Sequence, residues 1–103
     1  MISAKIPNDV RKAVYRRDGY RCALCDSTTG LQVHHAVHRS QGGTNSPMNL
    51  ITLCWKCHAA AHGTKIADYP DYVDQDYIEQ AVIEYLSDLY ACDGVIWNPW
   101  GKP

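Results

Sequence analysis

Two Cys-x-x-Cys pairs, Cys22 with Cys25 and Cys54 with Cys57, constrain this chain more than any other feature. Two such knuckles, brought together, supply the four thiolates of a tetrahedral structural zinc site. A staple is expected because a chain of 103 residues buries only a modest core. The alternatives are buried free thiols and a redox dithiol, and two spaced pairs in so short a chain favour zinc over both. The sequence therefore predicts a structural Zn²⁺ ion.

The number and spacing of the cysteines also indicate the cellular compartment. Five cysteines is an odd count, and the paired spacing argues against a secreted disulfide framework. Cys92 stands alone, and we expect a part-buried thiol that binds no metal. The first residues, Met1 to Lys5, lack the apolar core of a signal peptide, and no stretch is long enough to span a bilayer. We expect a cytoplasmic protein with no membrane partner.

The formal net charge of −1 hides a split between two parts of the chain. Residues 1–63 carry eight Lys and Arg against three Asp and Glu, a balance of +5. Residues 64–103 carry two against eight, a balance of −6. A basic first part can meet the phosphates of a nucleic acid while an acidic second part serves another purpose. The charge therefore does not exclude a nucleic-acid partner.

Hydrophobic periodicity predicts an α+β fold. Apolar residues recur at helical spacing over about residues 8–18, with Asn8 placed to cap this helix and Gly19 to end it. The later elements are a half-buried strand at 30–37, a loop at 38–49, an apolar strand at 50–53, an alanine-rich helix at 57–62 and an amphipathic helix at 77–91. Asp76 and Glu79 resemble a capping box for the last helix. Trp97 and Trp100 follow it and are expected to fold back onto the protein.

Histidines point to a second metal centre. His58 and His62 are four residues apart on one predicted helix, so they share a face, whereas Cys57 points elsewhere around the axis. His34 and His35 are the candidate partners of this couple. A lone histidine is more often structural than a ligand, but four in this arrangement beside a zinc staple favour a site.

The motifs together resemble those of the HNH endonuclease family. The matching segments are Cys22-x-x-Cys25, Val33-His34-His35, Arg39-Ser40-x-Gly42-Gly43, Asn49-Leu50, Leu53-Cys54-x-x-Cys57-His58 and His62. The family fold is the ββα-metal finger, here inside a zinc-stapled treble clef, with an N-terminal helix before it and a C-terminal helical extension after it. The resemblance covers about residues 7–63. It implies a nuclease core at 1–63 that contains the zinc knuckles, followed by an acidic extension with Tyr and Trp residues at 64–103 that packs on the core.

The resemblance also implies a role for each matching residue. His35 would be the general base, and Asn49 would fasten the loop to the strand that carries this base. His34, His58 and His62 would hold the catalytic metal. Neighbours in a regular strand point to opposite faces, so the strand must end, twist or bulge near His34 and His35 if both are to act at one site.

The implied activity is metal-dependent hydrolysis of phosphodiester bonds in DNA by a histidine-activated water, leaving 5′-phosphate and 3′-hydroxyl ends. Three neutral imidazoles suit Zn²⁺, Ni²⁺, Co²⁺ or Mn²⁺, and phosphate oxygens would improve the case for Mg²⁺. The alternative is a non-catalytic zinc module that binds nucleic acid or docks a protein. The complete set of histidines with Asn49 favours the enzyme, because a binding module has no need of them together.

Basic residues supply the candidate contacts to DNA. Arg39 follows the base-bearing strand, where a guanidinium can clamp a phosphate through paired hydrogen bonds, although a solvated loop arginine is the alternative. Sequence-independent phosphate contacts, or equally a solvated surface, are expected of Arg11, Lys12, Arg16 and Lys56. His38 stands where the family often has proline, and we interpret it as an incidental surface histidine in preference to a phosphate contact. Gly42 and Gly43 let the loop turn.

The acidic extension is most simply a packing helix, because its apolar residues form one stripe. The stripe consists of Ile78, Val82, Tyr85, Leu86 and Leu89. The functional alternatives are a docking surface for a partner protein, a contact in a homodimer, or an acidic cover that limits nonspecific binding of DNA. Small proteins of this type resemble those encoded by phages and mobile elements.

Overall fold

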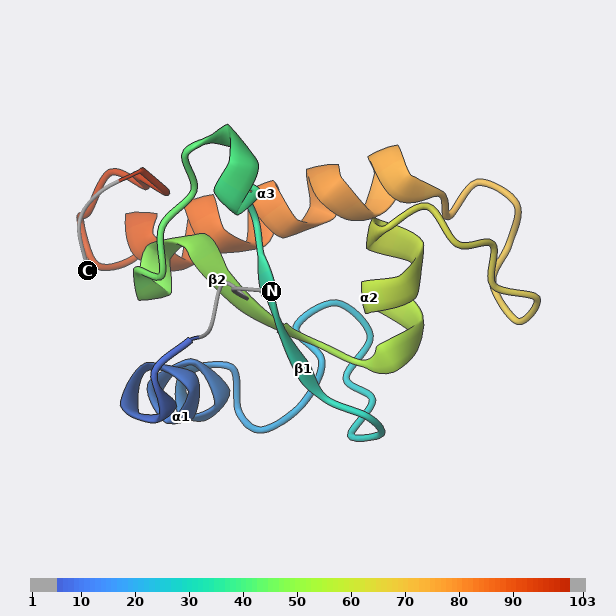
Figure 1. Cartoon of the computed structure of the whole chain (residues 1–103), viewed down its shortest axis with the longest axis horizontal. Coiled ribbons are helices and arrows are strands. Elements are labelled where there is room, and N and C mark those ends of the chain that lie inside the picture. The colour runs from blue at the N-terminus through green and yellow to red at the C-terminus, as the bar shows by residue number, and fades with distance from the viewer. Residues whose placement is uncertain (1–5, 101–103) are drawn as a thin grey trace.

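The computed structural model describes residues 6–100, and it has the expected α+β class (Figure 1). The elements, in chain order, are α1 (Asn8–Arg17), β1 (Gln32–His35), the 3-10 turns η1 (Arg39–Gln41) and η2 (Pro47–Asn49), β2 (Leu50–Leu53), α2 (Trp55–Ala61) and α3 (Gln75–Ala91). The stretch Met1 to Lys5, on which the expected lack of a signal peptide depends, lies outside the described residues. Among the helices that are described, none combines the length and the apolar character needed to cross a membrane.

A two-stranded antiparallel hairpin forms the centre of the molecule, with β1 paired to β2 (Figure 1). All four residues of β2 are buried, because helices cover both faces of the strand. Leu50 packs with Val14 of α1 on one face. Ile51 and Leu53 belong to the larger cluster that α2 and α3 close on the other face. The hairpin therefore separates an α1 side from an α2–α3 side.

Helix α3 completes the larger core from outside the segment that resembles the nuclease family. Its residues Ile78, Val82 and Leu86 are at most 2% exposed and pack in one cluster with cysteines and alanines of α2. The helix starts at Gln75 because the Asp74 side chain accepts a hydrogen bond from the backbone of Tyr77 at 2.9 Å. The expected capping box was therefore placed two residues too late.

Other boundaries also differ from the predicted ones. Pro7, and not Asn8, occupies the N-cap position of α1, and no side chain caps this helix. Strand β1 is half as long as expected. The amide of Ala36 still donates to the carbonyl of Asn49 at 2.8 Å, but the amide of Asn49 donates to Ser46 at 2.8 Å, and this turn ends the ladder. Helix α2 begins two residues before Cys57. Cys92 is exposed, contrary to the expected part-buried thiol.

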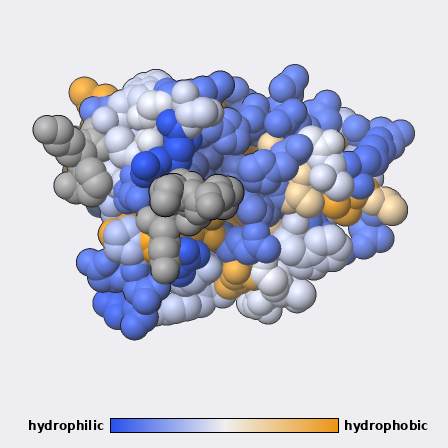
Figure 2. Space-filling view, viewed as in Figure 1, coloured by the Kyte–Doolittle hydropathy of each residue, from blue (hydrophilic) through white to orange (hydrophobic). Residues whose placement is uncertain are grey.

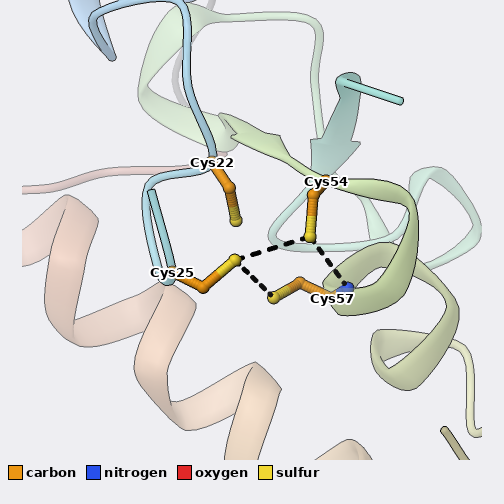
Figure 3. Close-up of side chains that lie close together, drawn as sticks. All are labelled: Cys22, Cys25, Cys54 and Cys57. Carbon is orange, nitrogen blue, oxygen red and sulfur yellow. Dashed lines mark hydrogen bonds between the residues drawn. The ribbon is translucent and has the colours of Figure 1, made fainter. Parts of the chain in front are cut away.

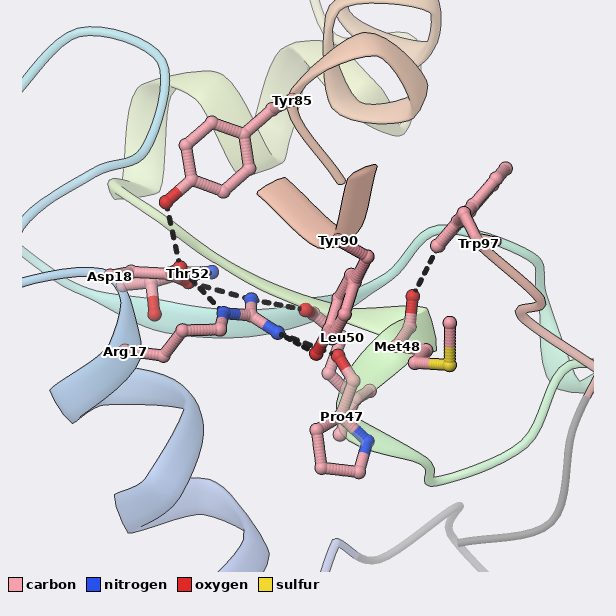
Figure 4. Close-up of polar contacts among 9 residues, drawn as sticks. All are labelled: Arg17, Asp18, Pro47, Met48, Leu50, Thr52, Tyr85, Tyr90 and Trp97. Carbon is pink, nitrogen blue, oxygen red and sulfur yellow. Dashed lines mark hydrogen bonds and ion pairs between the residues drawn. The ribbon is translucent and has the colours of Figure 1, made fainter. Parts of the chain in front are cut away.

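A buried ion pair joins α1 to the hairpin and to α3 (Figure 4). The Asp18 carboxylate is fully buried and accepts hydrogen bonds from Arg17, from Tyr85 Oη at 2.9 Å and from the backbone amide of Thr52 at 2.9 Å. Burial, followed by the bond to Asp18, raises the pKa of Tyr85 to about 12. Arg17 also donates to the carbonyl of Leu50 at 2.6 Å. The pair therefore fixes three elements with charge-assisted hydrogen bonds.

The C-terminal segment folds back onto the loop between β1 and β2. Trp97 donates from its indole to the carbonyl of Met48 at 2.6 Å (Figure 4), and Thr44 donates to the carbonyl of Pro99 at 3.2 Å. Trp100, by contrast, is 59% exposed. Figure 2 shows that the face in the standard view is mostly polar, with apolar side chains in small separate patches.

Candidate metal centres and active site

The four paired cysteines come together beside the start of α2 (Figure 3). Their sulfur atoms all lie within 4.8 Å of one another. Cys25 Sγ is 3.6 Å from Cys54 Sγ and 3.9 Å from Cys57 Sγ. Cys25 is exposed, and Cys22, Cys54 and Cys57 are buried.

This cluster fits a structural zinc ion. Four sulfurs bound tetrahedrally at about 2.3 Å lie about 3.8 Å apart, close to the measured separations. A hydrogen bond from Cys57 lowers the pKa of Cys22, whereas burial raises the pKa of Cys25 and the bond to Cys22 raises that of Cys57. A bound cation would supply the charge that deprotonates the remaining thiols. Cys54 Sγ also accepts from the backbone amide of Cys57 at 3.5 Å, which starts α2 and orients both ligands. The cysteine cluster can therefore hold a structural Zn²⁺.

Tyr69 covers the cysteine cluster from the segment between α2 and α3. Its hydroxyl lies 3.1 Å from Cys57 Sγ and 3.9 Å from Cys54 Sγ. Burial, and then the contact with Cys57, raises the pKa of Tyr69, so the phenol keeps its proton. A protonated phenol at this distance can donate to a thiolate. Partners of this kind orient metal ligands and tune the affinity for the metal.

Three histidines form a second cluster on the other side of α2. His34 lies in β1, His58 lies in α2 and His62 caps the end of α2. One ring nitrogen of each lies within 4.8 Å of the others. The ring centroids of His58 and His62 are 4.7 Å apart. The ring centroid of His34 lies 5.2 Å from that of His58 and 5.4 Å from that of His62. The register of the hairpin brings His34 to the other two histidines, because His34 pairs with Ile51 and points to the α2–α3 side.

The chemistry of this cluster suits a divalent ion. The Nε2 atoms of His58 and His62 are 3.2 Å apart, close to the about 3.3 Å expected of two nitrogens on one tetrahedral ion. Burial, and then the nearby histidines, lowers the pKa of His34 to about 3. Burial, followed by His62, also lowers the pKa of His58. Neutral rings are the form that binds metal, and three protein ligands leave room for a further group.

His35 points to the opposite face of the hairpin. It pairs with Leu50, which packs against α1, and it is the last residue of β1. Its Nε2 lies 2.9 Å from the side-chain oxygen of Asn45. Strand β1 ends at His35, but its pairing is regular up to that residue, so His34 and His35 point to opposite faces of the hairpin.

Asn49 fastens the loop that follows β1. Its side chain is fully buried, accepts from the amide of Val37 at 2.7 Å, and donates to the carbonyls of Val37 at 3.0 Å and Thr44 at 2.8 Å. Gly43 lies so close that a Cβ would meet the carbonyl oxygen of Val37 at 1.8 Å. Close approach of the backbone, and not only a turn, therefore requires glycine at this position. Gly42 adopts φ +90°, which supplies the turn.

The candidate DNA contacts lie on three elements, η1, α1 and α2. Arg39 is exposed at the start of η1. On α1, Lys12 and Arg16 are exposed and Arg11 is partly buried. Lys56 lies on α2 and pairs with Asp68 at 2.6 Å. Its charge is thus already compensated within the protein.

Three residues near these clusters were not predicted from the sequence to belong to a functional site. His38, interpreted as incidental, has its ring beside those of His34 and His62. Asn45 and Tyr69 contact His35 and Cys57 without lying in any of the motifs. The count of histidines carried a signal for His38. Nothing in the local sequence signalled the other two contacts.

Together these features define a small α+β domain in which one short helix contributes ligands to two groups of metal-ligating side chains from different faces. A profile of the HNH endonuclease family matches residues 22–64. The protein Anaredoxin of Nostoc sp. (strain PCC 7120 / SAG 25.82 / UTEX 2576) is 32% identical over 65 residues, which cover 59% of this chain and 86% of that protein. This chain belongs to the HNH endonuclease family. Membership indicates a function related to nucleic acids.

Proposed function

We propose that this protein is a metal-dependent DNA endonuclease that leaves 5′-phosphate and 3′-hydroxyl ends. One observation carries the proposal: in a member of the HNH family, His34, His58 and His62 bring three ring nitrogens within 4.8 Å. His35 and Asn49 occupy the two remaining motif positions at the end of the adjoining strand. A non-catalytic binding module has no use for this combination. The cysteine cluster would hold zinc within a treble clef and so position α2.

The hydrogen bond to Asn45 prepares His35 to act as the general base. Because the side-chain oxygen of Asn45 can only accept, Nε2 carries the proton and Nδ1 keeps its lone pair. His35 can then take a proton from water while the water oxygen bonds to phosphorus. The bond from phosphorus to the 3′ oxygen breaks, and that oxygen takes a proton from solvent.

His34, His58 and His62 are the residues that would hold the catalytic ion. The positive charge of an ion held there would polarise the phosphodiester and stabilise the departing oxygen. The all-nitrogen donor set favours Mn²⁺, Co²⁺, Ni²⁺ or Zn²⁺ over Mg²⁺, which prefers oxygen ligands. We therefore expect activity with several ions, with Mg²⁺ the most dependent on the phosphate oxygens.

Basic residues of α1 supply a candidate surface for the DNA backbone. Helix α1 packs on the face of the hairpin to which His35 points, and it carries Arg11, Lys12 and Arg16. These residues can attract phosphates without regard to sequence. Arg39 would clamp a phosphate near the reacting group. Lys56, paired with Asp68, is the weakest of the candidate contacts.

Nicking of supercoiled plasmid by zinc-loaded protein tests the proposal. Wild-type protein with Mn²⁺ or Mg²⁺ should convert supercoiled DNA to open circles with 3′-hydroxyl ends. His35→Ala should abolish nicking while circular dichroism and thermal melting remain those of the wild type. Wild-type protein that binds DNA and never cuts it with Mn²⁺, Mg²⁺, Co²⁺, Ni²⁺ or Zn²⁺ would instead establish a non-catalytic module.

A further inference from the structure

A fourth imidazole lies at the rim of the three-histidine cluster. His38 occupies the N-cap position of η1, three residues beyond the end of β1. Its ring centroid lies 6.2 Å from that of His34 and 6.1 Å from that of His62. Distances within the cluster itself are 4.7 to 5.4 Å. To share an ion with the other three, the ring of His38 would have to move inward by roughly 1 Å.

A carboxylate from α3 faces the same ring. Glu79 Oε2 lies 3.9 Å from His38 Nε2, and the two side chains are 40% and 38% exposed. Glu79 belongs to the acidic extension, outside the residues that match the HNH family. The extension therefore not only packs on the core but also brings a negative charge to the rim of the histidine cluster.

A carboxylate beside one nitrogen of an imidazole is the usual environment of a metal-bound histidine. Such histidines almost always donate their second ring nitrogen to a carboxylate, a backbone carbonyl or water, which fixes the ring and increases its basicity. Nε2 is the His38 nitrogen near Glu79, at 3.9 Å, so Nδ1 would be left for an ion once the two groups close to a hydrogen bond. We propose that His38 is a fourth histidine ligand of the ion held by His34, His58 and His62, and that Glu79 orients it.

This inference rests on the proposed function and extends it to the choice of metal. Zn²⁺ usually binds four ligands in proteins, so four imidazoles would leave it no position for a phosphate oxygen. Ions that accept five or six ligands would keep open positions. His38 would thus favour Mn²⁺, Co²⁺ or Ni²⁺ over Zn²⁺ as the activating metal.

Binding of Co²⁺ to the full-length protein tests this assignment without any measurement of cleavage. The protein is first loaded with one equivalent of Zn²⁺, and Co²⁺ is then titrated by calorimetry and by visible absorption. The absence of a thiolate-to-cobalt band in the near ultraviolet shows that zinc still occupies the cysteines. We expect His38→Ala to weaken Co²⁺ binding at least tenfold and to change the visible spectrum. Glu79→Gln should weaken binding about tenfold, as loss of an outer partner does in other metal sites.

Two further variants control the experiment. Glu84→Gln removes an exposed carboxylate from the same helix, one that accepts from Gln80 at 3.4 Å, and should bind Co²⁺ as the wild type does. His58→Ala should lose binding, because it removes a member of the cluster. Thermal melting checks each fold, and His38→Asn replaces His38→Ala if the latter melts early.

The outcomes separate this inference from the proposed function. Wild-type affinity and spectrum in His38→Ala, together with lost binding in His58→Ala, would overturn the role of His38 and leave the three-histidine site. Equal loss of affinity in Glu79→Gln and Glu84→Gln would overturn the orienting role of Glu79. Failure of the wild type to bind Co²⁺, or unchanged binding in His58→Ala, would overturn both proposals.

Discussion

Replacement of Asn49 by alanine tests how the loop that follows β1 is held. The side chain is fully buried and makes three hydrogen bonds, with the amide and carbonyl of Val37 and the carbonyl of Thr44. A hydrogen bond contributes about 1 kcal/mol net to stability, and buried partners left unsatisfied cost about 1–3 kcal/mol each. Because loop groups regain some water, we expect Asn49→Ala to lower the free energy of unfolding by about 3 kcal/mol. This is a large loss, because the total free energy of unfolding of a protein is only about 5–15 kcal/mol.

Urea unfolding of zinc-loaded protein, followed by circular dichroism, measures this loss. Hydrogen exchange then locates it, because the amide of Val37 should exchange faster in Asn49→Ala. Asn8→Ala is the matched control, since Asn8 is exposed and no side chain caps α1, and its effect should stay within about 0.5 kcal/mol. Plasmid nicking should fall with the loosened loop, which carries Asn45, the partner of His35.

A small effect would refute this reasoning. If Asn49→Ala changes the free energy of unfolding by less than about 1 kcal/mol and leaves exchange at Val37 unchanged, the three bonds do not hold the loop. If nicking disappears under those same conditions, Asn49 acts on the reaction by another route.

Three further predictions concern the ion pair and the zinc. Asp18→Asn should lower the free energy of unfolding by about 3–5 kcal/mol, because Arg17 stays buried without its counter-charge. Asp26→Asn, at an exposed site, should change this free energy little. Similar values for the two variants would contradict the role of the ion pair. Tyr69→Phe should release zinc to a chelating dye about tenfold faster than the wild type does. Tyr72→Phe is the control, because Tyr72 is 66% exposed. Equal rates of release from the wild type and both variants would exclude the hydrogen bond to Cys57. Complete removal of zinc by a chelator should abolish the cooperative melting transition, and added Zn²⁺ should restore it. If the zinc-free protein melts as the zinc-loaded protein does, the cysteines do not support the fold.

Features that depend on short spacing could be predicted from the sequence. Two knuckles of fixed length predict a four-sulfur cluster, and histidines four residues apart must share a helix face. The apolar run at 50–53 predicted β2 with its observed bounds. The α+β class and the family resemblance followed from the same local patterns. Boundaries set by other contacts, such as the end of β1 and the cap of α3, were wrong by one to a few residues.

Contacts between residues of distant segments depend on how the hairpin and the helices pack. The ion pair of Arg17 and Asp18 looks like ordinary charge at the end of a helix until Tyr85, 67 residues away from Asp18, closes over it. The same holds for Glu79 beside His38, where α3 and the loop after β1 approach each other. Residue type states what a side chain can bind, but its partner depends on how the hairpin and helices pack. The roles of buried polar groups were therefore beyond the reach of local pattern, whereas ligands grouped at short spacing were not.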